Sequence, residues 1–499
     1  MKTSVKKNIG DKIPHTMGLF LALICIVIVM SCILAMLNVS VIDPISKETI
    51  EIVNLLSARG VMEILGNMTS NFSSFSILGV TIVVGIAMGI CEVGGFFESL
   101  VKFSFSKVKS GNVAFFVSFL GVFMCSFDGA VSHLVVASLA ATIYLATGKN
   151  PLAGAICGYA AASTGAAMEF VPAFWQVAMT PLTEQYAQLL DPDFTMTLMS
   201  DSYVMITASV AAIFVNAIVT AKIIEPKLGE FTGKNTVSNN NKELTRQERK
   251  ALKVALICTG LFLITVIIAC IPQDSIFRSE TGSLVVNAPL MTAFENLLFF
   301  LFFIPGVVYA KMMGKIKSIK DLAEMMEKGL LGIVPFIVMA IIISQFLALF
   351  STSHLSKIIA ISAGNLLTNI SVSPMLVIIL LFVIYAFANI FIVSGTTQYM
   401  AFGPFLIPML MRINIHPAFA QVLLRLGDAS TNQFSPLNPF FPIIVTICNK
   451  YDNNFGAGKI LSVTVIYALF NILTFIAILL IFYFLKLPLG ITGLTALEM

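Results

Sequence analysis

Long apolar runs, separated by short polar segments, dominate the pattern of the chain. A helix needs about 20 apolar residues to cross a bilayer, and nine runs come close to that length or exceed it. The runs predicted to be transmembrane helices are Met17–Leu37, Ser76–Phe96, Val113–Ala146, Tyr203–Ile224, Ala251–Ile271, Ala293–Ala310, Gly329–Phe350, Met375–Met411 and Leu461–Leu485. The pattern therefore predicts an all-α polytopic membrane protein.

Two of these runs are too long for one crossing, and each contains a polar interruption. Ser126–Gly129 interrupts the run Val113–Ala146, and Ser394–Thr397 interrupts the run Met375–Met411. A helix broken by glycine and hydroxyl residues frees backbone groups for a ligand, as in the discontinuous helices of transporters. We therefore expect a broken transmembrane helix in both places.

Two more apolar stretches have a polar middle, and each follows one of the broken helices. Pro151–Thr180 contains Ser163–Gly165, and Pro417–Ile447 contains an arginine, an aspartate and three prolines. Such groups survive at membrane depth only inside protein or beside a water-filled cavity. We interpret both stretches as re-entrant hairpins that follow a broken span and precede a plain one, so that the same order of elements occurs twice.

The domain organisation follows from this architectural repeat. Residues 1–75 hold the N-terminal tail, the first span and an external loop, and residues 225–328 hold a cytoplasmic linker, two spans and an amphipathic surface helix. The first repeat is expected at 76–224, with its hairpin at about 151–180, and the second at 329–499, with its hairpin at about 417–447. The two repeats start on opposite sides of the membrane and are therefore expected to be inverted.

The distribution of lysine and arginine predicts the orientation. With the N-terminus in the cytoplasm, most of the 30 basic residues fall inside, as the positive-inside rule requires. Those expected outside are Lys47, Arg59, Lys149, Arg278, Lys357 and Lys486. We therefore expect a multi-pass membrane protein with an external C-terminus.

Composition agrees with this class and excludes several others. The chain is 58% hydrophobic and only 11% charged, with a mean hydropathy of +0.94, whereas soluble domains have about 25% charged residues. The net charge of +4 gives no reason to expect nucleic acid as a partner. The eight cysteines form no CxxC pair and lie in apolar segments. No cofactor is expected, apart from Na⁺ or H⁺ as a coupling ion.

Arg425 and Asp428 are the main candidates for a functional site. They lie three residues apart and share a face of a helix, and ionised groups inside a membrane are functional suspects by default. We expect Asp428 to bind the coupling ion, and Arg425 to bind a substrate carboxylate through its planar guanidinium. The alternative is a structural ion pair that holds the hairpin.

The other candidates lie in the polar middles of the four interrupted segments. Predicted substrate-binding residues are Ser163, Thr164, Gly165, Asn389, Ser394, Gly395, Tyr399, Thr431 and Asn432. Predicted ion-coupling residues are Asp128, Glu169 and Asn389, and Asn389 joins Asp428 as a possible Na⁺ ligand. The alternatives are interhelical hydrogen bonds for the amides and hydroxyls, a helix cap for Asp128 and a paired structural carboxylate for Glu169.

Segments along nearly the whole chain resemble the AbgT family of p-aminobenzoyl-glutamate transporters. They include KNPLAGAICGYAAASTG, SGTTQYMAFGPFLIPMLM and RLGDASTNQFSPLNPFFP. The resemblance implies a homodimer of nine spans and two hairpins per protomer, which moves a small aromatic or carboxylate-bearing solute, or exports sulfonamide-type antimetabolites, with an ion gradient. It implies that Asn389, Arg425, Asp428 and Pro436 line the site.

The chain also departs from the family pattern at several of these positions. Thr164 stands where the family has glycine, and Tyr399 where it has tryptophan. An acid of the family aligns with Gln176, whereas Glu169 replaces an uncharged residue. These exchanges change the charge of the site, so a Na⁺-coupled carrier of another small carboxylate or peptide-like solute is the alternative function.

Two other classes fit the sequence less well. Asp128 and Asp428 formally allow an intramembrane aspartyl protease, but such enzymes use GxGD, and Arg425 occupies the position of the first glycine. An arginine there would keep a neighbouring carboxylate charged, against the shared proton that acid catalysis needs. A channel is disfavoured because the polar groups cluster at one depth and line no continuous path.

Overall fold

The computed structural model describes residues 16–42, 49–75, 78–105, 112–127, 129, 132–170, 172–231, 244–284, 288–331, 334–359, 361–362, 373–392 and 394–497. Asp128, predicted to couple ions, lies outside these residues. The described chain is mostly helical, and its first part contains α1 (Thr16–Met36), β1 (Ser40–Ile42), β2 (Thr49–Glu51), α2 (Ala58–Ser73), α3 (Leu78–Gly94) and α4 (Phe96–Phe105). The antiparallel pair β1–β2 is an exception to the all-α expectation, and it joins α1 to α2.

Two sets of helices with the same internal order follow. The first contains α5 (Val113–Cys125), η3 (Ser132–Val136), α7 (Ala137–Ala146), α8 (Pro151–Gly165), α9 (Phe174–Ala187), α10 (Ser202–Val219), η4 (Thr220–Ile224) and α11 (Glu225–Leu228). The second contains α17 (Pro374–Asn389), α18 (Gly395–Met411), α19 (Pro417–Thr431), η6 (Asn432–Phe434), α20 (Phe441–Asn449) and α21 (Ala457–Phe484). Between the sets lie α12 (Arg246–Cys270), α13 (Pro289–Met312), α14 (Ile319–Leu331) and α15 (Val334–Thr352).

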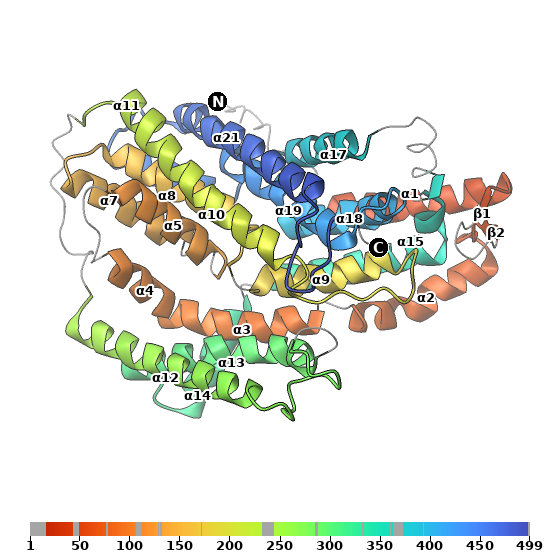
Figure 1. Ribbon diagram of the computed structural model, residues 1–499, viewed down its shortest axis with the longest axis horizontal. Coiled ribbons are helices and arrows are strands. Elements are labelled where there is room, and N and C mark those ends of the chain that lie inside the picture. The colour runs from red at the N-terminus through yellow and green to blue at the C-terminus, as the bar shows by residue number, and fades with distance from the viewer. Residues whose placement is uncertain are drawn as a thin grey trace, which may run out of the picture.

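The helices outside the two sets form supporting layers. In Figure 1, α3, α12, α13 and α14 run side by side along the lower edge, and α1, α2 and α15 lie together at the right with the two strands. Gly89 of α3 and Gly329 of α14 allow these helices to touch, because a Cβ on Gly89 would lie 2.3 Å from the Cα of Gly329. Small residues at such crossings are typical of membrane helices.

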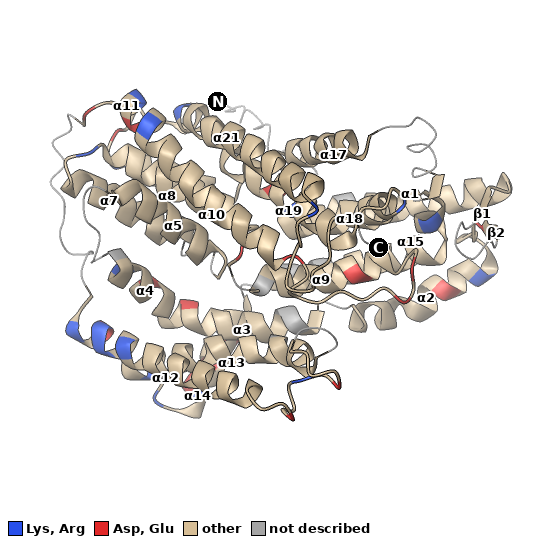
Figure 2. Cartoon of the chain, viewed as in Figure 1, with Lys and Arg blue, Asp and Glu red and all other residues tan. Residues whose placement is uncertain are grey.

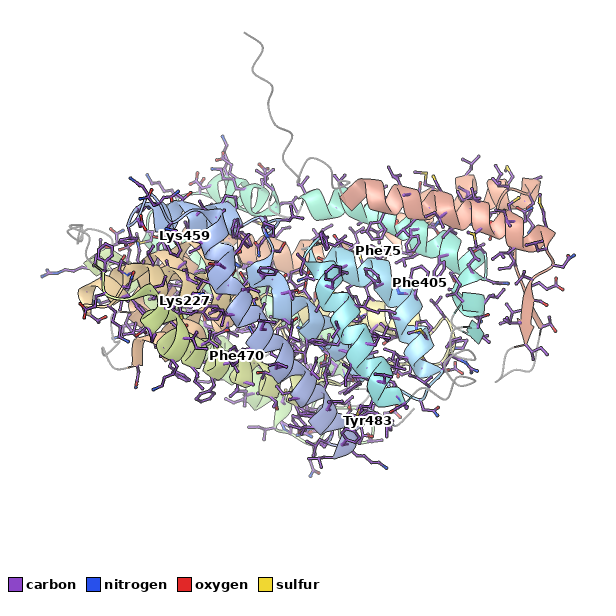
Figure 3. All side chains as sticks on the ribbon, turned by 90° about the horizontal axis from the view of Figure 1, so that it is seen from above. Phe75, Lys227, Phe405, Lys459, Phe470 and Tyr483 are labelled. Carbon is purple, nitrogen blue, oxygen red and sulfur yellow. The ribbon has the colours of Figure 1, made fainter. Side chains whose placement is uncertain are left out.

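Helix length and hydropathy support membrane insertion. Among the described residues, four helices are long and apolar enough to cross a bilayer, at Ser202–Leu228, Arg246–Cys270, Pro289–Met312 and Ala457–Phe484. The pair α3 and α4, bent by 63°, makes a fifth if it is one span. Large apolar side chains remain exposed along these helices: Phe470, labelled in Figure 3, is 43% exposed and Leu473 of the same helix is 67% exposed.

The first interrupted run, 113–146, folds into an antiparallel hairpin. Helix α8 packs between its two arms. Ser118 Oγ of α5 lies 3.5 Å from Cys157 Sγ of α8, and Gly165 packs against Val122, so α5 runs parallel to α8. The other arm runs the opposite way, because Gly154 packs against Tyr144 and Gly158 packs against Ala137.

His133 Nε2 lies 3.1 Å from Ser163 Oγ, near the C-terminal end of α8. The tip of the hairpin therefore lies at that end, where Ser126 Oγ donates to Met168 O over 2.8 Å. The expectation of a broken span at Val113–Ala146 is therefore wrong, because the chain reverses between α5 and α7 instead of continuing in one direction.

Residues 151–187, by contrast, run through in one direction as two helices with an extended break. Asn150 Nδ2 donates to Leu228 O over 3.2 Å at one end of the neighbouring helix. Ser209 Oγ donates to Glu169 O over 3.2 Å in its middle, and Gln176 Nε2 donates to Asp201 Oδ1 over 2.6 Å at its start. In a hairpin, the second half would lie again near Leu228, where the first half begins. The contacts instead progress steadily toward Asp201, so the prediction of a hairpin at Pro151–Thr180 is wrong.

The second set repeats this arrangement. Tyr385 of α17 packs against Gly427 of α19, and Thr431 Oγ1 donates to Ala386 O over 2.9 Å, so α17 runs parallel to α19. Helix α18 starts at the same end, with Gly395 against Asp428, and it ends beside the start of α19. The hairpin is therefore 374–411.

Pro417–Ile447 is not a hairpin, because α19 and α20 lie on either side of a break, formed by η6 and turns, and run antiparallel to α21. Phe419 contacts Tyr483 near the end of α21, whereas α20 leads to its start. Apolar length and a polar middle are shared by hairpins and by broken spans. Only the packing of neighbouring helices distinguishes the two.

Each predicted broken span is a hairpin, and each predicted hairpin is a span. Lys149 and Arg412 therefore lie at different ends of the molecule from those predicted. Lys149 Nζ lies 2.8 Å from Glu225 Oε2, at the end that also carries Lys227, and Figure 2 shows lysine and arginine gathered there on α11 and at the start of α12. Arg412, which follows the second hairpin, lies at the opposite end. Lys149 therefore belongs with the basic cluster from which the sequence reading had separated it.

The close packing of α8 against its hairpin gives a test of this architecture. A Cβ on Gly158 would lie 2.7 Å from the Cα of Ala137, so Gly158→Ala must push the arm α7 away. Overpacking of this kind costs about 1–3 kcal/mol, and we expect a lower midpoint of thermal unfolding in detergent. Gly66→Ala of α2 is the matched control, since its added methyl group meets nothing within 4 Å. Equal midpoints for the two variants would contradict the packing.

Candidate functional site

The breaks and hairpin tips of both sets meet in the interior of the molecule. Thr164 of α8 lies 3.5 Å from Gln433 Oε1 beyond α19, and Asn471 Nδ2 of α21 donates to Thr164 Oγ1 over 3.1 Å. Every residue of α8 and of α19 is buried. The C-terminal ends of these two helices therefore lie together in the protein interior, away from lipid.

Asn389 joins the second hairpin to α19. Its Nδ2 donates to Asp428 O over 2.9 Å, to Thr431 Oγ1 over 3.1 Å and to Asn432 Oδ1 over 2.9 Å. One side-chain amide thus satisfies three acceptors at the point where α19 ends. The predicted site residues Asn389, Asp428, Thr431 and Asn432 are brought together.

Asp428 is buried and only partly hydrogen-bonded. Asn432 Nδ2 donates to its Oδ2 over 3.1 Å, while its Oδ1 has no partner. The second hairpin approaches the carboxyl group so closely that a Cβ on Gly395 would lie 3.0 Å from Oδ2. Glycine at this position lets the hairpin backbone reach the carboxyl group.

Ser394 and Pro436 border this cluster. Ser394 Oγ caps α18, accepting from Thr397 N over 3.4 Å. Both residues are exposed, whereas Asn389 and Asp428 beside them are buried. The edge of the second hairpin tip therefore lies at the surface of the protein.

The first hairpin tip contributes a histidine and a serine. His133 Nδ1 bonds Gly129 O over 2.7 Å, its Nε2 faces Ser163 Oγ over 3.1 Å, and its ring stacks on Phe440 at 4.2 Å between centroids. Ser163 is therefore held by the first hairpin, and Thr164 by the second set. Gly165 has a packing role, since a Cβ there would lie 2.7 Å from Val122 Cα.

Arg425 lies at the centre and bridges the two sets. Its Nη1 donates to Gln176 Oε1, and its Nη2 donates to Ala167 O over 3.0 Å. Glu169 Oε1 lies 3.5 Å from Nη2 and Asp201 Oδ2 lies 3.9 Å from Nη1. The expected structural pair of Arg425 with Asp428 is thus replaced by contacts with the first break.

Asp201 and Gln421 belong to this cluster, although the sequence reading missed them. Asp201 Oδ2 accepts from Gln421 Nε2 over 2.9 Å, and Asp201 is 1% exposed. Its position just before an apolar helix suggests a surface loop. The sequence did contain one signal for Asp201: it is an acidic residue directly before an apolar helix, α10.

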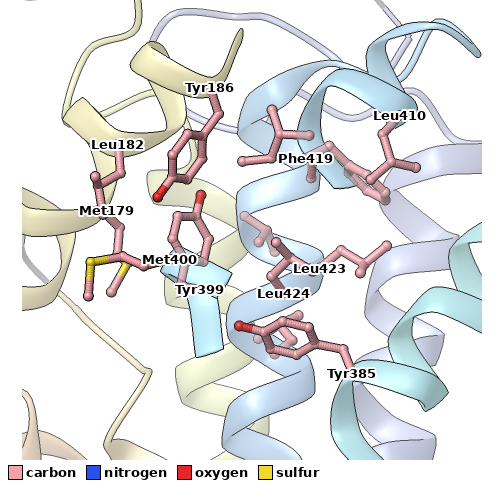
Figure 4. Packing of buried hydrophobic residues seen from close by; sticks show 14 of the residues in the cluster. Met179, Leu182, Tyr186, Tyr385, Tyr399, Met400, Leu410, Phe419, Leu423 and Leu424 are labelled. Atoms are coloured by element: carbon pink, nitrogen blue, oxygen red, sulfur yellow. The ribbon is translucent and has the colours of Figure 1, made fainter. Parts of the chain in front are cut away.

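Tyr399 connects the cluster to the second hairpin. Its hydroxyl bonds Thr183 Oγ1 of α9, and Thr183 also donates to Gln421 Oε1. Figure 4 shows Tyr399 facing Tyr186 from the opposite helix, with Leu423 and Leu424 alongside. The ring of Tyr399, which was predicted to bind substrate, is 1% exposed and enclosed by these neighbours.

Two cavities open beside the C-terminal half of α9. One of about 930 Å³ lies between α9, residues 195–198 and the start of α13. The other, about 360 Å³, lies between α9, α18, α2 and α15. Gln185 and Gln188 border both, and either volume suits a drug-sized ligand or the approach of one.

The described residues contain no group of three or more histidine, cysteine, aspartate or glutamate side chains suited to a transition metal. Oxygen atoms without a partner lie instead on Asn389 (Oδ1), Gln398 (Oε1) and Asp428 (Oδ1). Carboxylate and amide oxygens are the ligands of hard cations.

Polar helix breaks that meet inside an apolar helical protein are typical of secondary transporters, and comparison with known proteins agrees. The chain belongs to the AbgT putative transporter family, whose family model matches residues 3–497. It is therefore a membrane protein of a transporter family.

Relatives support the same assignment. The p-aminobenzoyl-glutamate transport protein of Escherichia coli K12 is 28% identical over 485 residues, 97% of this chain and 95% of that protein. The structure of Neisseria gonorrhoeae MtrF, described as one of a class of antimetabolite efflux pumps, superposes with a TM-score of 0.88 at 26% identity, over 95% of this chain and 96% of that one. The Alcanivorax borkumensis YdaH transporter shares the fold, with a TM-score of 0.90 at 24% identity, over 96% of this chain and all of that one.

The three-way contact of Asn389 gives a test of the site. Asn389→Asp replaces the donor by an oxygen that faces three acceptors, so we expect a loss of about 1–3 kcal/mol in the free energy of unfolding. The measurement is the thermal midpoint in detergent at neutral pH. Asn453→Asp, an exposed position, is the control. A variant as stable as the control would mean that Asn389 does not hold α19.

Proposed function

We propose that the protein is an ion-coupled secondary transporter of p-aminobenzoyl-glutamate or of related aromatic, carboxylate-bearing solutes, including sulfonamide-type antimetabolites. The named substrates of the relatives support the chemical class. The observation that supports the mechanism most is the burial of Arg425 and Asp428 on one helix, against the break of the first set and the tip of the second hairpin. A guanidinium at that place is available to a carboxylate that can displace its internal partners.

The substrate carboxylate, in this proposal, replaces the looser contacts of Arg425. Glu169 and Asp201 lie 3.5 and 3.9 Å from the guanidinium nitrogens, distances too long for strong charge-assisted hydrogen bonds. Thr431, Asn432, Ser163 and Thr164 surround the same interior and supply hydroxyl and amide partners. Gly395 keeps the hairpin backbone close.

The coupling ion would bind at Asp428 and Asn389. Each has an unpartnered side-chain oxygen, and Asp428 accepts either a proton or Na⁺. Glu169 is the second candidate for a coupling carboxylate. A Na⁺-coupled carrier of another small carboxylate or peptide-like solute uses the same groups and differs only in the substrate.

The crossing pattern that supports alternating access has nine spans. They are α1, α3–α4, α8–α9, α10–α11, α12, α13, α15, α19–α20 and α21, with the hairpins 113–146 and 374–411 re-entering from opposite sides. Asn216 of α10 and Asn471 of α21 lie 3.3 Å apart where the two sets cross, as expected of inverted repeats. We propose an elevator-like movement of these sets against α1–α4 and α12–α15.

The proposed setting is the cell (inner) membrane, with the N-terminus in the cytoplasm, the C-terminus outside and a homodimer as the assembly. The lysine and arginine cluster at the α11 end supports the orientation. The exposed apolar side chains of α12 leave room for lipid or for a second protomer.

Counterflow of labelled p-aminobenzoyl-glutamate into proteoliposomes tests the function. We expect exchange of internal unlabelled for external labelled solute, and net accumulation only when a Na⁺ or H⁺ gradient is imposed. No exchange above protein-free liposomes would refute this substrate. Exchange with no effect of either gradient would refute ion coupling.

Asp428→Asn tests the coupling residue. The amide keeps the volume of the carboxyl group and the bond to Asn432, but it can neither take up a proton nor offer a charge to Na⁺. We expect gradient-driven accumulation to fall to background, while the protein elutes from detergent as the wild type does. Full accumulation by this variant would exclude Asp428 from coupling.

Arg425→Ala tests substrate recognition. We expect anionic substrates to lose about 10-fold to 150-fold in apparent affinity, the range for removal of a charged hydrogen bond of roughly 1.5–3 kcal/mol, and neutral analogues much less. Competition of each solute class against labelled substrate measures the ratio. An equal loss for both classes would assign Arg425 to structure alone.

A further inference from the structure

Asp201 is a buried carboxylate that has no role of its own in the proposed binding of substrate or coupling ion. It lies at the start of α10 and is 1% exposed. Its hydrogen bonds come from two neutral amides, Gln176 Nε2 to Oδ1 over 2.6 Å and Gln421 Nε2 to Oδ2 over 2.9 Å. No cationic nitrogen in the described part of the chain lies closer to it than Arg425 Nη1, at 3.9 Å.

The negative charge of Glu169, the neighbouring carboxylate, has more stabilising partners than that of Asp201. Its Oε1 accepts from Gln176 N over 2.9 Å and its Oε2 from Ala173 N over 3.4 Å. These N–H groups open α9, where the helix dipole favours negative charge. Arg425 Nη2 lies 3.5 Å away. The negative charge of Glu169 is therefore stabilised by these N–H groups, and Glu169 also interacts with the guanidinium of Arg425.

The remaining surroundings do not supply a second positive charge for Asp201. The titratable groups that face it are Glu169 from the break, Tyr399 from α18 and Arg425 from α19. Asp428 lies one helical turn beyond Arg425. With both Glu169 and Asp201 ionised, this cluster holds an excess negative charge, and an uncompensated ion in a protein interior costs several kcal/mol.

Space for a water molecule, which could exchange a proton with the carboxylate, exists beside Asp201. A small cavity of about 20 Å³ is bordered by Glu169, Gln176, Asp201 and Ser202. About 10–15 Å³ suffices for one water molecule, provided that polar groups hold it. The cavity borders both carboxylates, so a single water there reaches both.

We propose that Asp201 is a proton-carrying residue of the transport cycle, an inference that rests on the proposed transport function. Uptake forms an O–H bond on one Asp201 oxygen with a proton from the water phase, and release breaks the same bond. When a substrate carboxylate draws Arg425 away, Asp201 loses its nearest cation and takes up the proton. When the substrate leaves and Arg425 returns, the proton is released.

The hydrogen bonds around Asp201 connect its protonation to the second hairpin. A protonated Asp201 needs an acceptor, which Gln421 offers when its amide turns so that Oε1 faces the acid. Thr183 then loses the acceptor that it now has in Gln421 Oε1, and its remaining partners are Met179 O of its own helix and Tyr399 of α18. Protonation therefore changes the bond that ties α9 to the hairpin.

The test measures proton movement and substrate exchange in the same proteoliposomes, with a trapped pH dye and labelled p-aminobenzoyl-glutamate. In the wild type we expect substrate addition to move protons and the counterflow rate to depend on pH. In Asp201→Asn we expect the proton signal to fall well below that of the wild type and the pH dependence to flatten. Asp193→Asn, an exposed acid in the same segment, is the control and should behave like the wild type.

Asp201→Glu should restore both signals, because it restores an ionisable oxygen. Wild-type proton movement in Asp201→Asn would overturn the proposal, as would a loss of counterflow in Asp201→Asn that Asp201→Glu does not repair. If Asp201→Asn aggregates, Gln421→Leu decides: losing a donor to the charged form should shift the pH profile of counterflow to higher pH, and an unshifted profile overturns the proposal. Absence of counterflow in the wild type would instead refute the proposed transport function.

Discussion

Backbone groups that a helix break releases inside an apolar protein must find partners within the protein, since lipid offers none. The whole interior of this molecule follows from that constraint. Arg425 satisfies Ala167 O, Ser126 satisfies Met168 O and Asn389 satisfies Asp428 O. Each of these donors comes from an element other than the break it serves, so the four interruptions can exist only together.

The two central helices, α8 and α19, are held in place by different kinds of contact. Helix α8 is built almost entirely from small residues, and its hairpin arms touch its backbone at Gly154, Gly158 and Gly165. Helix α19 carries the charged and amide side chains instead. Close packing thus holds one half in place, while hydrogen bonds at the C-terminal end of α19 hold the other. Apolar side chains of the two sets also pack together, so movement of the second set relative to the first would break both polar contacts and core packing.

The contacts of Arg425 with two carboxylates bear on the proposed transport. Glu169 and Asp201 lie 3.5 and 3.9 Å from its nitrogens, whereas its shorter hydrogen bonds are to neutral groups. In the proposed mechanism, a substrate carboxylate competes with these two anions for one guanidinium, and the anion that loses must be neutralised or rehydrated. That mechanism links substrate binding to the uptake of a cation through burial, without any direct contact between the two. Two cavities border α9, the helix that carries Gln176 and Thr183 of the same network.

The amino-acid sequence by itself determined the class of the protein, the places of its four polar interruptions and most of the residues that meet there, including Asn389, Arg425 and Asp428. It could do so because charges and helix breaks in an apolar chain are costly and stand out. Only the tertiary structure decided which interrupted segments turn back and which run through, because both have two apolar halves around a polar middle, and the choice depends on whether a third helix packs between the halves. The same holds for Asp201, whose burial comes from Gln176 and Gln421, residues 25 and 220 positions away in the chain.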